Sequence, residues 1–162
     1  MIQLEKNDRF DGIIEGYSSE GMGVARPDGR AVFVRGAIKG EKCRVHVLKA
    51  GKSAVFGRAE AILEPSEHRC EPECAYYGRC GGCAVLHMDY AEELNFKRAK
   101  VDAALERIGG LALRTDSIVG SDSRKRYRNK AIYAVGNGEK GAVVGFYQSR
   151  SHRVIAVEDC LI

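Results

Sequence analysis

The sequence lacks any apolar run near the ~20 residues that a membrane-spanning helix needs. Its first residues, Met1 to Asp8, also lack the apolar segment of a secretory signal. We therefore expect a cytoplasmic protein with no membrane partner. Thiols stay reduced in the cytosol, where they bind metals, so the six cysteines are not expected to form a disulfide scaffold.

A binding motif for a nucleotide-like cofactor is lacking as well. No strand is followed by a glycine-rich turn into a helix, and the spaced glycines of residues 16–23 fall between expected strands. Cys43 and Cys70 have no surroundings that indicate an activated thiolate. We expect no catalytic residue within this sequence.

The composition is that of a folded chain. Its 162 residues are 44% hydrophobic, enough for one domain or two small ones. The net charge of +4 is compatible with nucleic-acid binding but does not demand it. The distribution of charge is therefore more informative than its sum.

Residues 1 to about 63 read as short strands separated by glycines, with a turn at Asp28-Gly29. The expected strands are Asp11 to Glu15, Gly23 to Arg26, Ala31 to Val34, Lys42 to Lys49 and Ala54 to Leu63. Five short strands in this length predict a small closed barrel of the OB type. Alternation places Cys43 on the apolar face with Val45 and Val47, as a small core residue.

Pro65 marks a boundary, and one helix is expected further on. Asp89 is its predicted N-cap, with Glu92 completing a capping-box pattern and Gly109-Gly110 ending it. Its apolar stripe, which includes Val101 and Ile108, is expected to pack on the neighbouring domain.

After Ser117, apolar and polar residues alternate again with the two-residue period of a β-strand. Lys130 to Val135 and Ala142 to Tyr147 are expected to form a hairpin around Asn137-Gly138, followed by a strand from Arg153 to Val157. The fold class is thus α+β and mostly β, with a barrel over residues 1–64 and a second domain over residues 65–162.

Four cysteines form the most informative pattern. Cys74, Cys80 and Cys83 share one loop, and Cys160 follows far downstream. Structural zinc sites usually draw two close pairs of ligands, whereas three clustered thiolates and one remote one are the arrangement of plant-type ferredoxins. Gly81 and Gly82 would let the backbone approach a bulky cluster. Scattered structural cysteines are the plainer alternative.

These segments together resemble the N-terminal part of the iron–sulfur RNA uridine-5-methyltransferases that act on 23S ribosomal RNA. Gly21 to Ala25, Val32 to Ala37 and Gly40-Glu41 look like the TRAM domain, an RNA-binding OB-like barrel. Cys74 to Cys83 is similar to the family's C-x5-C-G-G-C loop. Tyr127 to Lys130, Gly145 to Tyr147 and Ser151-His152 resemble stretches of its central domain.

The resemblance implies that a [4Fe–4S] cluster is held by Cys74, Cys80, Cys83 and Cys160. The sequence departs from the family pattern at Leu86-His87, because family members usually have a glutamine before this histidine. Cys70 lies outside the ligand set, either as a spare thiol, which we favour, or as an alternative ligand.

The resemblance also implies an activity. Family members add a cysteine thiolate to carbon 6 of uracil, transfer a methyl group from S-adenosylmethionine to carbon 5, and remove a proton with a base. In the family, the methyl-donor site, the nucleophilic cysteine and the base belong to a C-terminal Rossmann-like domain that this sequence does not supply. This chain alone is therefore expected to be inactive, and the cluster is expected to shape the RNA-facing surface rather than to carry electrons.

RNA recognition is what remains, and ribosomal RNA is favoured over transfer RNA. The densest basic run consists of Arg124, Lys125, Arg126, Arg128 and Lys130, interleaved with Tyr127 and Asn129. The predicted RNA contacts are Arg124, Arg126, Arg128, Lys130 and His152. Arg128 and Lys130 are expected on one face of a strand, with Tyr127 on the other. A solvated strand edge is the plainer alternative for this run.

The leading hypothesis is therefore the RNA-recognition part of an RNA methyltransferase, acting as a monomer. A zinc- or iron–sulfur-stabilised RNA-binding module without a methyltransferase is the alternative. An independent iron–sulfur electron carrier is a third hypothesis, which the basic patterning disfavours.

Overall fold

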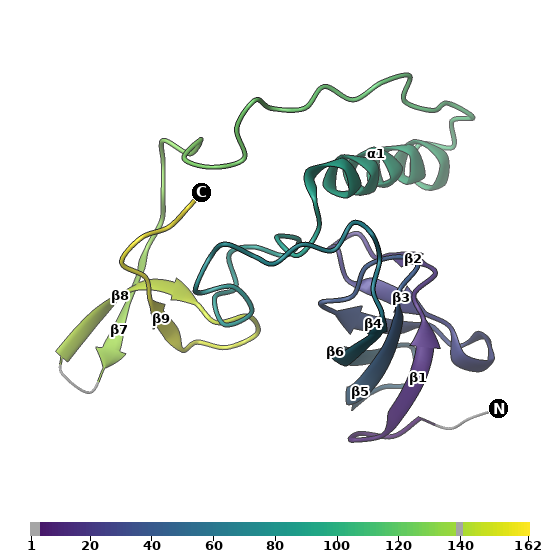
Figure 1. Cartoon of the computed structure of the whole chain (residues 1–162), viewed down its shortest axis with the longest axis horizontal. Coiled ribbons are helices and arrows are strands. Elements are labelled where there is room, and N and C mark those ends of the chain that lie inside the picture. Colours follow the sequence, from purple (N-terminus) through teal and green to yellow (C-terminus); the bar gives the residue numbers. More distant parts are fainter. Residues whose placement is uncertain (1–3, 139–140) are drawn as a thin grey trace. The chain divides into compact units, whose positions relative to one another are not determined.

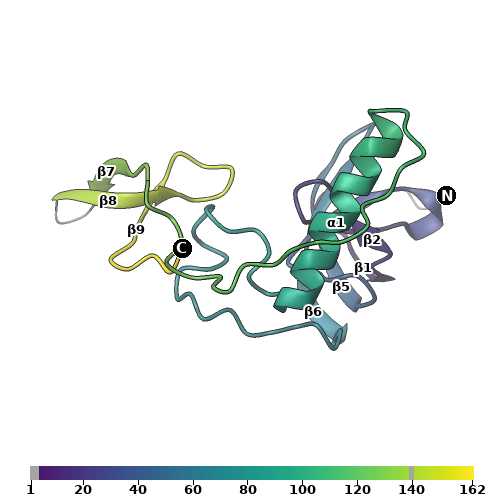
Figure 2. The same cartoon turned by 90° about the horizontal axis from the view of Figure 1, so that it is seen from above.

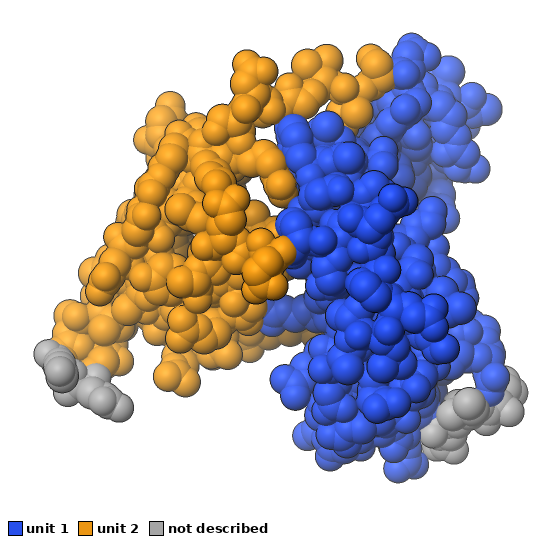
Figure 3. Space-filling view, viewed as in Figure 1, with its two compact units in different colours: residues 1–70, 87–116 blue, residues 71–86, 117–162 orange. Residues whose placement is uncertain are grey.

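The computed structural model describes residues 4–138 and 141–162. The chain forms two compact units, Met1–Cys70 with His87–Asp116 and Glu71–Leu86 with Ser117–Ile162 (Figure 3). Each unit is thus built from two separate stretches of chain. The domain boundary expected after residue 64 stays a prediction, since compactness groups the helix after the cysteine loop with the barrel.

The first unit contains a mixed sheet of six strands (Figure 1). The strands are β1 (Arg9–Ile13), β2 (Gly16–Tyr17), β3 (Gly23–Ala25), β4 (Val32–Arg35), β5 (Lys42–Ala50) and β6 (Val55–Glu64). Their order across the sheet is β1-β5-β6-β4-β3-β2, and only the β4–β6 pair is parallel. A short 3-10 helix, Pro27–Gly29, replaces the expected simple turn between β3 and β4.

The extra strand arises because the first strand bends. β1 pairs with β5 at one edge of the sheet, and β2 pairs with β3 at the other edge. Between them, the amide of Ile14 donates to Glu41 O (2.9 Å) and the amide of Glu15 donates to Val24 O (2.8 Å). The two edges are consequently joined by continuous chain and the sheet curls. The expectation of five strands is wrong in number, because one bent segment contributes two.

The core lies inside this curl. On β5 the side chains of Cys43, Val45 and Val47 are fully buried, and they pack with Val32 and Val55 of other strands. The predicted alternation along β5 is therefore confirmed. Burial raises the pKa of the Cys43 thiol to about 11, as expected for a core residue rather than a reactive one.

A buried ion pair ties the segment after β6 to the barrel. The fully buried carboxylate of Glu41 accepts hydrogen bonds from Arg69 Nη2 (2.7 Å), from the amide of Ile38 (2.8 Å) and from that of Ser66 (3.3 Å). Burial pushes the pKa of Glu41 upward, but the bonds from Arg69 and Ile38 outweigh it and hold the pKa below its ordinary value.

The ends of the cysteine loop meet at a neck, formed by residues 68–70 and 87–89. The amide of Cys70 donates to His87 O (3.0 Å), and the amide of Asp89 donates to His68 O (2.8 Å). Arg69 and Met88 form the antiparallel bridge between them. The neck belongs to the first unit, while the loop that it closes, residues 71–86, belongs to the second.

Helix α1 (Tyr90–Arg107) follows the neck and lies over the β2–β3 end of the sheet (Figure 1, Figure 2). Its predicted N-cap is confirmed, because Asp89 Oδ1 accepts from the amide of Glu92 at 2.8 Å. Of the helices in the described residues, none is long and apolar enough to cross a membrane.

The helix contacts the barrel through a face that the apolar stripe did not predict. Glu92 accepts a 2.5 Å hydrogen bond from the Tyr17 hydroxyl, and Phe96 packs edge-on against the Tyr17 ring. Val101 and Ile108 of the stripe are 49% and 88% exposed. The expectation that the stripe packs on a neighbouring domain is therefore wrong at these positions.

The second unit contains an antiparallel sheet of β7 (Ala134–Gly138), β8 (Gly141–Tyr147) and β9 (Val154–Ala156) in that order. Gly138 pairs with Gly141, so Asn137-Gly138 ends β7 instead of forming the turn. Glu139 and Lys140, which complete the expected loop, lie outside the described residues.

Residues 111–133 form no helix or strand. β7 starts at Ala134, four positions after the start expected at Lys130. The strand that would place Arg128 and Lys130 on one face and Tyr127 on the other is therefore wrong. Side chains alternate between two faces only in a strand. Outside a strand, ion pairs and turns decide where the basic side chains point.

We predict that Glu41→Gln destabilises the first unit by about 3 kcal/mol, because it leaves the Arg69 guanidinium without its buried counter-charge. The measurement is urea unfolding at pH 7. The lowered pKa of Glu41 makes its stabilisation complete above its ordinary value of 4.5 and lost as the pH falls through the folded-state pKa. The variant should accordingly show a shallower loss of stability in acid.

Glu60→Gln is the matched control, because Glu60 of β6 forms a comparable bidentate bond with Arg9 of β1, and both side chains are accessible to solvent. It should change stability little. Equal effects of the two substitutions would contradict the structural role given to Glu41.

Candidate metal centre and RNA-binding surface

The structure brings the four predicted cysteine ligands into the second unit. Cys74, Cys80 and Cys83 lie in the loop and Cys160 follows β9, and all four are partly buried free thiols. Burial raises the pKa of Cys83, and the thiolate charges of Cys160, Cys80 and Cys74 raise it further, in that order. The four sulfur atoms are thus within electrostatic range of one another.

Thiols that influence one another's charge do not by themselves have the geometry of a metal site. Within residues 4–138 and 141–162, no three His, Cys, Asp or Glu side chains stand in positions to hold a metal ion. The chemistry of the donor set fits a thiolate-bound cluster, since four reduced thiols from two separate segments face one region. The ligand assignment and the identity of the metal stay predictions.

Backbone hydrogen bonds shape the cysteine loop. The amide of Tyr77 donates to Cys74 O (3.0 Å), and the amide of Cys80 donates to Tyr76 O (2.8 Å). The Tyr77 hydroxyl donates to Ala84 O at 2.9 Å, which joins the two halves of the loop. The first and second cysteines are therefore held on one compact turn.

Gly81 places the loop against the end of β8. Its amide donates to Tyr147 O (3.0 Å), and a Cβ atom at this position would lie 2.8 Å from that same oxygen. Cys80 and Gln148 form the adjoining antiparallel bridge. A side chain at residue 81 would consequently separate the cysteine loop from the sheet that leads toward Cys160.

The Cys160 segment is held by Arg126. The guanidinium of Arg126 donates to both carboxylate oxygens of Asp159 (2.6 and 2.7 Å) and to Cys160 O (3.0 Å), while its amide donates to Leu161 O (2.9 Å). These bonds from Arg126 lower the pKa of Asp159. On the other side, the amide of Glu158 donates to the Tyr76 hydroxyl at 3.2 Å, which links the segment to the cysteine loop.

Three of the five predicted RNA contacts line one hollow of about 760 Å³ in the second unit. Arg126, Arg128 and Lys130 lie along it, together with the rings of Tyr133 and Phe146, whose centroids are 5.0 Å apart. The other lining residues are Ala131, Ile132, Glu158, Asp159, Cys160 and Ile162. Basic groups, aromatic rings and a predicted cluster ligand thus border a single space.

Arg124 and His152 are not among the residues that line this hollow. His152 is exposed and packs edge-on against Tyr147, with ring centroids 6.1 Å apart. Lys125, inside the basic run, forms an ion pair with Glu73. The run is therefore divided between ion pairs that shape the unit and side chains that face the hollow.

His87 and Cys70 belong to the neck of the first unit and not to the group of four thiols. His87 is 3% exposed, and its burial, followed by the positive charge of Arg69, lowers its pKa to about 4. It is consequently neutral at physiological pH. Its ring is buried near the charges of Arg69 and Glu41.

Sequence reasoning missed the partners that position the site, Asp159 and Tyr76. An acidic pair directly before Cys160 was visible in the sequence, but its basic partner 33 positions away was not. The Tyr133–Phe146 pair was also missed, because Tyr133 was placed within an expected strand instead of before it.

Comparison with known proteins gives a domain match first. Residues 6–60 match the TRAM domain, and they cover all six strands of the curled sheet except the end of β6. The resemblance of this part of the chain to a TRAM domain is therefore confirmed.

Relatives extend the similarity over nearly the whole chain. An uncharacterized RNA methyltransferase of Clostridium tetani is 41% identical over 162 residues, which are 99% of this chain and 35% of that protein. Another from Halalkalibacterium halodurans is 41% identical over 160 residues, which are 98% of this chain and 35% of that protein. This chain spans about a third of the length of the curated relatives that it matches.

A solved structure has the same fold over 93% of this chain and 32% of its own, with a TM-score of 0.60 and 22% identity. It is the crystal structure of the Pyrococcus abyssi tRNA (uracil-54, C5)-methyltransferase in complex with S-adenosyl-L-homocysteine. At this identity the likeness concerns the fold alone. Residues 6–60 thus match a TRAM domain, and nearly the whole chain is similar to about a third of the length of proteins named RNA methyltransferases.

Proposed function

We propose that this chain is the RNA-recognition and [4Fe–4S]-binding part of an S-adenosylmethionine-dependent RNA uracil-C5 methyltransferase. The methyl-donor site and the catalytic residues would lie outside these 162 residues. The observation that carries the proposal is the basic and aromatic hollow that Cys160 borders, in the unit where the four thiols gather. The relatives named RNA methyltransferases support the same assignment.

The proposed ligands are Cys74, Cys80, Cys83 and Cys160. The cluster would supply a structural cross-link between the cysteine loop and the segment after β9, with no electron transfer to the methylation. The chain's own residues already bring these two parts together. Tyr76 bonds to the amide of Glu158 beside Asp159, and Arg126 holds Asp159 in turn.

The RNA surface that we propose is the hollow itself. Arg128 and Lys130 would contact phosphates, and the Tyr133 and Phe146 rings would accept an unpaired base. The Arg126 guanidinium already donates hydrogen bonds to Asp159 and to the carbonyl oxygen of Cys160. We therefore assign Arg126 to positioning the Cys160 segment and not to contacting RNA. Ribosomal RNA remains the proposed substrate, recognised by a monomer in the cytoplasm.

The cluster gives the first test. Anaerobically prepared protein should be brown, with broad absorbance near about 400 nm and iron and sulfide in equal amounts. Replacing Cys74, Cys80, Cys83 or Cys160 by serine should bleach it, because each removes one thiolate ligand. Cys70→Ser is the matched control and should keep the colour, since Cys70 lies in the first unit. A colourless wild-type protein with one bound zinc would refute the assignment.

RNA binding gives the second test. Arg128→Gln and Lys130→Gln should each weaken binding of a labelled stem–loop RNA several-fold and lower the salt slope by about 0.7 to 0.9 per lost phosphate contact. Fluorescence anisotropy over a range of salt concentrations measures both quantities. Lys125→Gln removes the same charge from the same run but outside the hollow. It should bind as the wild type does, and a loss equal to that of Arg128→Gln would count against the hollow.

A further inference from the structure

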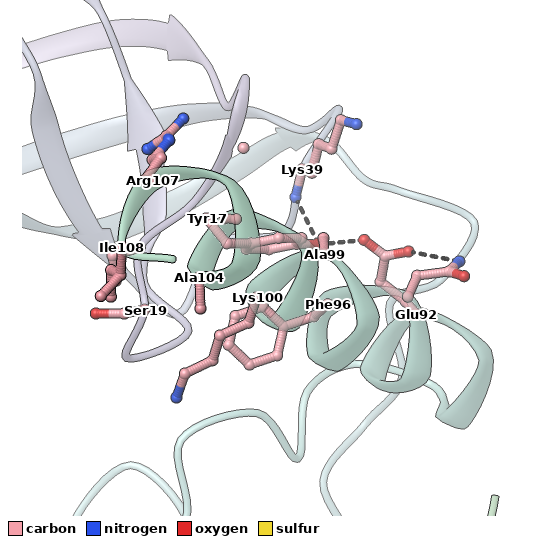
Figure 4. Close-up of a pocket in the computed structure, with 14 residues that line it drawn as sticks. Tyr17, Ser19, Lys39, Glu92, Phe96, Ala99, Lys100, Ala104, Arg107 and Ile108 are labelled. Atoms are coloured by element: carbon pink, nitrogen blue, oxygen red, sulfur yellow. Dashed lines mark hydrogen bonds between the residues drawn. The ribbon is translucent and has the colours of Figure 1, made fainter. Parts of the chain in front are cut away.

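A second hollow, of about 630 Å³, lies entirely within the first unit (Figure 4). One wall is the segment from Gly16 to Ser19 at the end of the bent first strand, and the opposite wall is α1. Neither the TRAM match nor the basic run accounts for this space as a site. Its lining combines aromatic and aliphatic side chains with three basic ones.

Two aromatic rings line the hollow, those of Tyr17 and Phe96. The Tyr17 hydroxyl donates to Glu92 Oε1 (2.5 Å) and accepts from the amide of Lys39 (3.0 Å), so the ring is fixed at both ends of its polar group. Phe96 stands edge-on to it, with centroids 5.4 Å apart and planes at 72°. Figure 4 shows the Tyr17 hydroxyl bonded to Glu92 and to the amide of Lys39, with Phe96 projecting from the helix. A flat ligand would find aromatic surface that is already ordered.

Three cations line the same hollow. They are Lys39, Lys100 and Arg107, and within the described part of the chain none of them is in an ion pair. Lys97, one position after Phe96 on the same helix, pairs with Glu93 at 2.7 Å instead and does not line the hollow. Arg98 of α1 donates to Thr115 and does not line the hollow either, so Lys100 and Arg107 are the α1 cations that an anion in this space would meet.

One carboxylate, Glu92, also lines the hollow, but its oxygens already accept from Tyr17 and from Asn95 Nδ2 (3.3 Å). Three cations against this one carboxylate leave the lining with a net positive charge. An anion with a flat apolar part satisfies both features of the lining, whereas an acidic peptide supplies only the charge.

We propose that this hollow binds one unpaired nucleobase of an RNA strand against Phe96, with the flanking phosphates on Lys39, Lys100 and Arg107. The proposal rests on the proposed function for its partner, RNA, and adds a contact on the first unit that is separate from the basic hollow of the second. Stacking of a base on the ring supplies sequence-tolerant affinity, and the cations supply the salt-dependent part.

The test is fluorescence anisotropy with the full chain and a short labelled oligouridine, which has unpaired bases and no duplex. Phe96→Leu keeps an apolar side chain but removes the aromatic face, and it should weaken binding roughly tenfold. Lys100→Gln and Arg107→Gln should each lower the salt slope by about 0.7. Lys97→Gln is the matched control on the same helix and should leave affinity and slope as in the wild type.

A second measurement does not depend on the fold of any variant. Oligouridine that carries 4-thiouridine should cross-link to wild-type chain on irradiation, in the peptides that contain Tyr17 or Phe96. Cross-links confined to other peptides, or Phe96→Leu and Lys100→Gln binding as tightly as Lys97→Gln, would overturn this inference and leave the proposed function intact. Displacement of the RNA by polyglutamate at equal charge would also overturn it. Wild-type protein that binds no RNA at low salt would overturn both.

Discussion

The carboxylate of Glu41 is fully buried, and a buried charge must be compensated or it destabilises the fold by several kcal/mol. Its partners come from three places in the chain: Ile38 beside it, and Ser66 and Arg69 beyond the last strand of the barrel. The segment that leaves β6 is thereby fixed on the barrel before the cysteine loop begins. The neck and the start of α1 are built on that anchored segment.

This anchoring has a consequence for the loop. Because residues 68–70 pair with residues 87–89, the two ends of the loop meet whatever happens at its tip. Bringing Cys74 and Cys83 together costs conformational entropy, because it closes a loop. Backbone pairing in the first unit already closes most of that loop, so the remaining entropy cost is smaller. The remaining long closure, to Cys160, is supported by Tyr76 and Arg126.

The sequence predicted those features that depend on local pattern. Alternation along β5 identified the buried face with Cys43, and Asp89 was found as the N-cap from its position before a helical period. The features that it could not predict depend on partners distant in the chain. The bend at Ile14 is visible only when both edges of the sheet are known, and the contact of Glu92 with Tyr17 joins residues 75 positions apart.

The candidate site was predicted only in part for the same reason: sequence spacing does not reveal contacts between residues that are distant in the chain. Spacing alone was enough to group the cysteines, because three of them share one loop. The direction of the basic side chains was not encoded in spacing, since residues 124–133 form no strand and Arg126 has a left-handed backbone with φ of 56°. Lys125 and Arg126 are positioned instead by ion pairs with Glu73 and Asp159.

The division of each unit into two stretches of chain also matters during synthesis. The barrel strands all leave the ribosome before the cysteine loop, so the first unit can begin to fold early. With the proposed ligands, the loop then offers three thiolates while β7, β8 and β9 are still being made. For the proposed cluster to form, the nascent chain would have to keep those thiols reduced and unreacted until Cys160 emerges, so the order of translation would limit when the cluster could be inserted.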